Sequence, residues 1–297
     1  MHKTYKKYYY TKRNQKEFSI SAKIYENIEK KSGETVKIAF FHGLGGAKNS
    51  FDELCDNLAK KLFSKNVSHK FVVFDLLGHG ESSISSKIED YNPKNQSKIF
   101  LEILKKEFGE SEKFSIFGHC FGSFVAIELA SRTKDKIKNL YLVSTSPFSN
   151  SGKILKPILG KKSFFIKNFP RAFFGILGER REFFELDYSK FKKTSDLSLK
   201  RILADIKTTS LKPYLSSFLS INIESLQNSL ESFLRKNKER VFVFHGEKDK
   251  IFSFEKVKKF FQERGVKIFK IENEGHLPVL NSVEYLSEEI SNLEAPS

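Results

Sequence analysis

The chain has 297 residues, of which 52 are Lys or Arg and 36 are Asp or Glu, so its formal net charge is +16. This length suffices for one α/β domain with an inserted subdomain. Its two cysteines do not suggest a disulfide framework and suit a reducing compartment. No stretch approaches the roughly 20 apolar residues that cross a bilayer, and the basic N-terminus has no apolar signal core. We therefore expect a cytoplasmic protein without a transmembrane segment.

The positive charge is concentrated in two segments. Lys and Arg outnumber Asp and Glu by nine over residues 148–221 and by five over residues 1–17. A basic surface attracts polyanions, anionic lipids or acidic proteins. The sequence contains no zinc finger, nucleic-acid reader motif or long basic amphipathic tail, so nucleic acid is not expected as a partner.

The predicted elements alternate in type along the chain. Segments 5–11 and 18–25 alternate apolar and polar residues, which predicts two antiparallel edge strands. From residue 36 onward, strands alternate with helical patterns, namely strand 36–41, helix 51–63, strand 71–75, helix 94–108, strand 114–118, helix 121–131 and strand 139–145. This alternation predicts an α/β fold with a mostly parallel central sheet and helices on both faces.

The alternation breaks over residues 147–221 and resumes with a helix near 223–236, a strand from 241 and a strand over 266–271. The break is rich in phenylalanine and has mostly helical patterns. We interpret it as a helical cap inserted into a core domain formed by residues 1–146 and 222–297. Most of its rings are expected to form the cap's own core, while some line an apolar roof for an acyl chain. Its basic exterior suggests an acidic acyl carrier protein as a partner.

Cys120 lies in a Gly-x-Cys-x-Gly turn between a predicted strand and a predicted helix. Gly118 and Gly122 allow the chain to turn sharply there. The partial positive charge at a helix N-terminus favours a thiolate and a developing oxyanion. Such a short pattern also fits a buried cysteine in an ordinary turn, so the interpretation depends on other segments.

Three further segments carry patterns that bear on the interpretation of Cys120. A buried strand runs into a glycine-rich loop at residues 42–46, and this loop lacks the Gly-Lys-Ser/Thr ending or G-x-G-x-x-G spacing of a phosphate cradle. Near the C-terminus, Asp249 follows the strand that starts at 241, and His276 follows the strand over 266–271. The chain order is therefore cysteine, acid and histidine.

Together these segments resemble the α/β-hydrolase fold family over about residues 35 to 290. The resemblance implies that Cys120 is the nucleophile and that His276 is the general base. It further implies that Asp249 holds the imidazole in the right tautomer and stabilises the imidazolium. Most members of the family have serine at the nucleophile position. Dienelactone hydrolases and polyhydroxyalkanoate synthases are similar to this chain in having cysteine there.

The resemblance also assigns the residues around the nucleophile. The backbone N–H groups of Leu44 and Phe121 would form the oxyanion hole, where each donor contributes roughly 2.7–4 kcal/mol in the transition state. Asp75 and His79 lie in a turn whose role in the family is mostly structural, so we expect neither to be catalytic. No metal ion or organic cofactor is implied.

Four other chemically reactive residues have simpler interpretations. Cys55 lies at helical spacing with apolar residues and is predicted to be a core residue. His119, next to the nucleophile, is expected to pack or form a hydrogen bond rather than react. His245 ends its strand and is predicted to be structural, and Glu247 is predicted to be solvated.

The sequence therefore predicts hydrolysis of a carboxylic ester or thioester through a Cys-His-Asp triad and a covalent thioester. Two alternatives stay open. One is an acyltransferase that uses the same residues with a carrier-protein or coenzyme A thioester as acyl donor. The other is a non-catalytic binding protein, which the presence of all the catalytic segments in one chain disfavours.

Overall fold

The computed structural model describes residues 2–11, 17–27, 35–147, 209 and 211–295. No helix in these ranges combines the length and the apolar character needed to cross a membrane. The elements, in chain order, are β1 (His2–Thr11), β2 (Glu17–Asn27), β3 (Val36–Phe41), η1 (Lys48–Phe51), α1 (Asp52–Ser64), β4 (His69–Phe74), η2 (Ile88–Tyr91), α2 (Pro93–Phe108), β5 (Phe114–His119), α3 (Phe121–Thr133), η3 (Lys134–Lys136), β6 (Ile137–Val143), α8 (Leu211–Leu219), α9 (Ile223–Asn237), η5 (Lys238–Arg240), β7 (Val241–Gly246), α10 (Phe254–Gln262), β8 (Lys267–Ile271), α11 (Pro278–Asn281) and α12 (Val283–Glu294).

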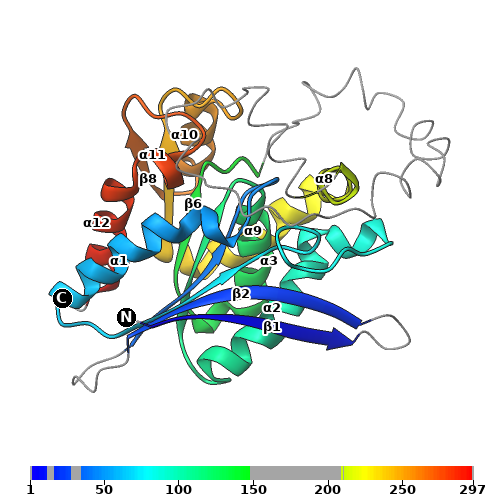
Figure 1. Cartoon of the computed structure of the whole chain (residues 1–297). Helices are drawn as coiled ribbons and strands as arrows, with labels where there is room; N and C mark the ends of the chain where they lie inside the picture. The colour runs from blue at the N-terminus through cyan, green and yellow to red at the C-terminus, as the bar shows by residue number, and fades with distance from the viewer. Residues whose placement is uncertain (1, 12–16, 28–34, 148–208, 210, 296–297) are drawn as a thin grey trace.

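The strands form one twisted sheet in the order β1-β2-β4-β3-β5-β6-β7-β8 (Figure 1). The β1–β2 and β2–β4 pairs are antiparallel, and every pair from β4 to β8 is parallel. The predicted fold class is confirmed, including the antiparallel strands at one edge.

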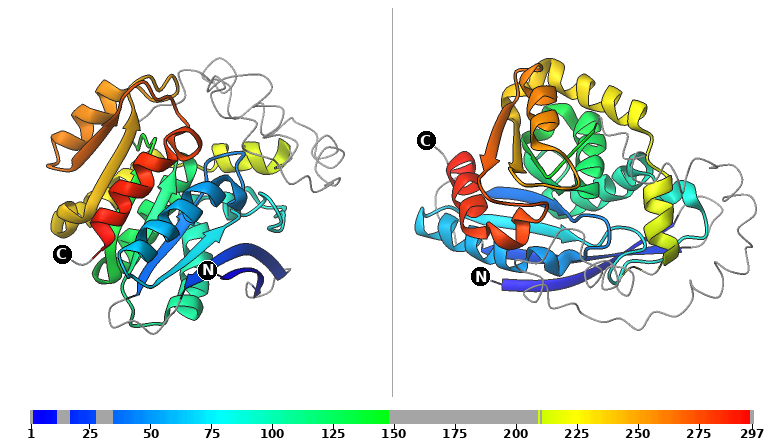
Figure 2. Two further views of the ribbon diagram at one scale, coloured as in Figure 1. Left: turned by 60° about the vertical axis from the view of Figure 1, so that its left-hand side comes forward. Right: turned by 90° about the horizontal axis from the view of Figure 1, so that it is seen from above.

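The sheet has an apolar core on each face. Successive side chains of a strand point to opposite faces, so Ala39 and Phe41 of β3 enter one core while Ile38 and Phe40 enter the other. Apolar residues of α2, α3, α9 and α10 complete the first core, and those of α1, α11 and α12 complete the second. Figure 2 shows these helices as layers on the two sides of the sheet.

Some predicted boundaries were wrong by a few residues. The strand predicted over 139–145 is β6, which starts at Ile137 and ends at Val143. It ends there because Ser144 adopts φ 48°, a left-handed backbone that cannot continue a strand. The helix predicted over 51–63 starts one residue later, because residues Lys48–Phe51 form a 3-10 turn before it.

The fold brings the carboxyl ends of β3, β5, β7 and β8 to the same end of the sheet, because all four strands run parallel. The segments that follow these strands contain every predicted site residue. Of the cap predicted over 147–221, residues 148–208 and 210 lie outside the described residues. The cap's boundaries and its carrier-protein partner therefore stay predictions.

Candidate active site

Cys120 occupies a sharp turn between β5 and α3. Its backbone angles are φ 50° and ψ −115°, an uncommon conformation for a residue with a side chain. The turn needs both flanking glycines. A Cβ atom on Gly118 would lie 2.5 Å from the Cα of Ser123, and one on Gly122 would lie 2.1 Å from the carbonyl oxygen of Phe41. This turn around Cys120, which we call the elbow, is thus packed against the end of β3. The Cys120 side chain lies at the N-terminus of α3.

His276 and Asp249 meet above this elbow although 27 residues separate them in sequence. The Nδ1 of His276 lies 2.8 Å from Oδ2 of Asp249, and the charge of the Cys120 side chain acts on His276. Because Nδ1 is occupied by Asp249, Nε2 is the ring nitrogen that remains for the sulfur. Gly246 permits the approach of the two loops, since a Cβ atom there would lie 2.1 Å from the carbonyl oxygen of Gly275.

Asp249 is held as a carboxylate by donors on both oxygens. Its Oδ1 accepts hydrogen bonds from the amides of Ile251 at 2.8 Å and Phe252 at 2.9 Å. Its Oδ2 faces His276, and Nε2 of His245 lies 3.2 Å from the same oxygen. Burial opposes ionisation, but the charges and hydrogen bonds of His276 and His245 hold the pKa of Asp249 well below its usual range.

The environment of His276 favours the imidazolium. Burial alone would lower its pKa, but the charges of Cys120 and Asp249 and the hydrogen bond to Asp249 raise the pKa of His276 to about 10. The protonated imidazole is thus favoured beside the Asp249 carboxylate.

The glycine-rich loop lies directly against the elbow. A Cβ atom on Gly43 would lie 3.1 Å from the Cβ of Cys120. Phe121 is the first residue of α3, where first-turn amides have no intrahelical acceptor. Among the described residues no acceptor is found for the Leu44 amide. The two predicted oxyanion donors therefore lie in adjoining segments on either side of the cysteine.

His42 fixes the shape of this loop. Its Nδ1 donates to the Gly43 carbonyl at 2.8 Å, and its Nε2 accepts from the Leu76 amide at 3.0 Å. Complete burial lowers the pKa of His42 to about 4 against the opposing charge of Asp75. The bond accepted at Nε2 requires the neutral ring, so this histidine is a structural support of the loop.

A buried ion pair braces the segment that follows the loop. The Asp75 carboxylate accepts from the Lys48 amide and from its Nζ, both at 2.7 Å, and from the Glu81 amide at 3.0 Å. The structural role predicted for Asp75 agrees with these contacts. Lys48 was not singled out from the sequence, because a lysine near a turn is usually solvated, whereas its side chain here is only 6% exposed.

The other singled-out residues take the places expected of them. Cys55 is fully buried in the core beneath α1. Glu247 is exposed and accepts from Lys270 and from the Asn273 amide. His245 is buried and its Nε2 lies 2.8 Å from the Phe252 carbonyl. Its contact with Asp249 was missed, although the spacing of four residues across a turn could have indicated it.

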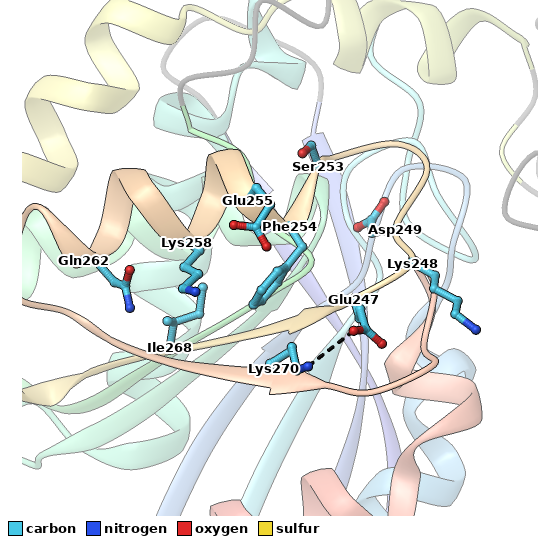
Figure 3. A pocket seen from close by; sticks show the side chains of 10 residues that line it. All are labelled: Glu247, Lys248, Asp249, Ser253, Phe254, Glu255, Lys258, Gln262, Ile268 and Lys270. Carbon is cyan, nitrogen blue, oxygen red and sulfur yellow. Dashed lines mark hydrogen bonds and ion pairs between the residues drawn. The ribbon is translucent and has the colours of Figure 1, made fainter.

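A cavity of about 570 Å³ adjoins the acid loop (Figure 3). It lies among the loop after β7, helix α10 and strand β8, and Figure 3 shows the ion pair between Glu247 and Lys270 on its wall. Both carboxylate and ammonium side chains line this cavity. Such a charged lining does not suit an acyl chain. Within the described residues no group of three or more His, Cys, Asp or Glu side chains is arranged to hold a metal ion.

Comparisons with known proteins agree with this architecture. Residues 38–282 match the family model described as the alpha/beta hydrolase fold. Lipase 1 of Psychrobacter immobilis is 25% identical over 266 residues, which span 87% of this chain and 75% of the lipase.

Two solved structures show the same fold at low identity. A protein described as a lipase, from Acinetobacter baumannii, has a TM-score of 0.61 at 17% identity and covers 97% of this chain and 90% of its own. A laboratory-evolved variant of potato epoxide hydrolase has a TM-score of 0.65 at 15% identity, with 97% and 98% covered. Their different descriptions show that the fold alone does not assign the reaction. Since the family model spans most of its length, the chain belongs to the α/β-hydrolase fold family.

Proposed function

We propose that this protein hydrolyses carboxylic esters or thioesters through a covalent thioester on Cys120. The observation that carries the proposal is the position of Cys120 at the N-terminus of α3, together with the 2.8 Å hydrogen bond between His276, whose pKa the Cys120 charge raises, and Asp249. The similarity to a lipase over most of the chain supports an acyl substrate.

In the first half of the reaction, the Cys120 thiolate attacks the carbonyl carbon of the substrate, and its electron pair forms the carbon–sulfur bond. The carbonyl oxygen becomes an oxyanion, which the amides of Leu44 and Phe121 would stabilise. The bond to the leaving oxygen or sulfur then breaks, and the His276 imidazolium gives its Nε2 proton to that leaving group. An alcohol or thiol departs, and the acyl group stays on sulfur.

In the second half, His276 is neutral and acts as general base. It takes a proton from water as the water oxygen attacks the thioester carbonyl. The oxyanion collapses, the carbon–sulfur bond breaks, and the carboxylic acid leaves while the thiolate–imidazolium pair is restored. Asp249 keeps its negative charge throughout, because the Ile251 and Phe252 amides and the His276 ring donate to it.

The test is turnover of a panel of p-nitrophenyl esters and acyl thioesters of increasing chain length. The parent protein and Cys55→Ala should both release product, because Cys55 lies in the core away from the elbow. Cys120→Ala should reduce turnover to the rate of buffer. Product release by Cys120→Ala at the parent rate would refute the proposed role of Cys120.

Acyl transfer is a second candidate because the nucleophile is a cysteine. A thioester is more activated than an ester and can acylate an alcohol, amine or thiol as well as water. Adding such acceptors should divert product from free acid if transfer is the reaction, and an unchanged partition supports hydrolysis. Stable binding of acyl ligands without any adduct on Cys120 would instead indicate a binding protein.

A further inference from the structure

His119 connects three parts of the candidate site. It is the last residue of β5 and directly precedes Cys120. Its Nε2 lies 2.9 Å from the backbone carbonyl oxygen of His276. Its ring also packs on the glycine-rich loop, where a Cβ atom on Gly43 would lie 2.9 Å from Nδ1. One buried side chain, only 5% exposed, thus contacts both the loop of the candidate base and the loop of a candidate oxyanion donor.

We propose that His119 is a positioning residue that holds His276 at its working distance from Cys120. This inference rests on the proposed function, since it gives His119 its role through the base and the nucleophile. His119 itself transfers no proton and touches no reacting atom.

The hydrogen bond defines which form of His119 is needed. A backbone carbonyl only accepts, so Nε2 of His119 must carry the hydrogen and donate it to His276. A replacement keeps the function only if it offers an N–H at a similar reach. Glutamine provides one from its side-chain amide, whereas leucine has a similar volume and no donor.

The loop of His276 is otherwise fixed mainly from the other side. Gly246 of β7 approaches Gly275 so closely that a Cβ atom would lie 2.1 Å from the Gly275 oxygen, and the Lys248 amide donates to the Glu274 carbonyl at 2.8 Å. These contacts place the loop relative to β7 and the acid. The bond from His119 places it relative to β5, the strand that carries the nucleophile.

The consequence is a coupling between His119 and the charge state of the site. If the His276 loop moves away from β5, the imidazolium moves away from the sulfur and stabilises the thiolate less. A bond that served stability alone would not change the pH dependence of the sulfur's reactivity. Alkylation of Cys120 as a function of pH therefore separates the two roles.

The experiment compares the parent with His119→Leu, His119→Gln and the control His69→Leu. His69 is also a buried histidine, 1% exposed, but it lies at the amino end of β4, opposite the site. Iodoacetamide alkylation is followed by intact-protein mass spectrometry from pH 5 to 10. Cys55 should stay unmodified, because burial raises the pKa of its thiol.

We expect His119→Leu to alkylate about tenfold more slowly than the parent at pH 6, with the midpoint of its profile shifted upward, since reactivity follows the thiolate fraction. Its kcat for an ester should fall roughly tenfold to a hundredfold with little change in KM. His119→Gln should restore both, and His69→Leu should keep the parent profile despite any loss of stability.

A parent-like alkylation profile for His119→Leu would overturn the inference, as would an equal shift in His69→Leu. Failure of the proposed function has a different signature. In that case the parent alkylates Cys120 at low pH and responds to His119→Leu, yet no ester or thioester in the panel is turned over.

Discussion

Gly122→Ala should damage the site through the backbone rather than through a side chain. Gly122 lies in the first turn of α3, in a helical conformation in which alanine is favoured over glycine by about 1 kcal/mol. Its added Cβ atom would lie 2.1 Å from the Phe41 oxygen and 2.5 Å from the His42 oxygen. Neither contact can be relieved by rotating a side chain, so β3 and α3 must separate.

The separation needed is about 1 Å, because carbon and oxygen atoms in contact normally lie near 3.3 Å. Overpacking of this kind costs about 1–3 kcal/mol, which outweighs the gain in helix propensity. The displaced segment leads directly into Gly43 and Leu44. Since a misplacement of about 1 Å can cost about a hundredfold in rate, kcat should fall about tenfold to a hundredfold.

The assay pairs urea unfolding with ester hydrolysis at a temperature at which all variants are folded. The control is Gly265→Ala, whose φ of 67° imposes strain of about 1–2 kcal/mol on alanine. Gly265 lies just after the C-terminal end of α10. A Cβ atom added there would come within 3.4 Å of the flexible Lys238 side chain, which is an ordinary contact distance. Gly265→Ala should lose stability and keep kcat. A Gly122→Ala variant with parent stability and parent kcat would refute this reasoning.

Three further predictions concern charge and hydrogen bonds. Asp249→Asn should lower kcat at least a hundredfold, because the imidazolium of His276 loses its carboxylate partner. Glu247→Gln, at an exposed position, should keep the parent kcat. Equal activity of the two variants in an ester assay would contradict the role of Asp249. The pKa of His42 is lowered from 6.5 to about 4 in the folded protein, so the unfolded chain binds a proton first as pH falls. The free energy of unfolding should therefore drop by about 3 kcal/mol between pH 7 and 4. Urea titrations of His42→Gln should show a pH dependence smaller by this amount. Glu294→Ala removes the acceptor of the Tyr141 hydroxyl at 2.7 Å in a fully buried site, so it should cost about 1–3 kcal/mol in thermal unfolding and leave KM and kcat unchanged.

Much of the fold could be predicted because the central strands carry continuous apolar runs between helical patterns. Buried parallel strands are apolar on both faces, as β3 shows with Ile38 and Phe40 on one side and Phe41 on the other. The end of β6 could not be predicted, because Ser144 favours no left-handed turn by its residue type. Its amide still donates to the Phe244 carbonyl on the neighbouring strand, and the chain leaves the sheet directly after that bond.

The candidate site shows the same division. Cys120, Asp249 and His276 could be singled out because each follows a strand in a short pattern, and parallel strands bring their ends together. The supporting contacts could not. The bond from His119 to the His276 carbonyl spans 157 positions, and the bond from the Leu76 amide to His42 Nε2 spans 34. Such pairs depend on the register of separate loops, which no local pattern encodes.

The most direct test of the central claim is intact-protein mass spectrometry after brief exposure to activated acyl esters and thioesters, followed by peptide mapping. The account predicts that the parent gains the mass of one acyl group on Cys120, that the adduct decays in water, and that Cys120→Ala gains nothing. An adduct of equal yield on Cys120→Ala, or product release by the parent without any adduct on Cys120 at the earliest times, would contradict a covalent cysteine mechanism.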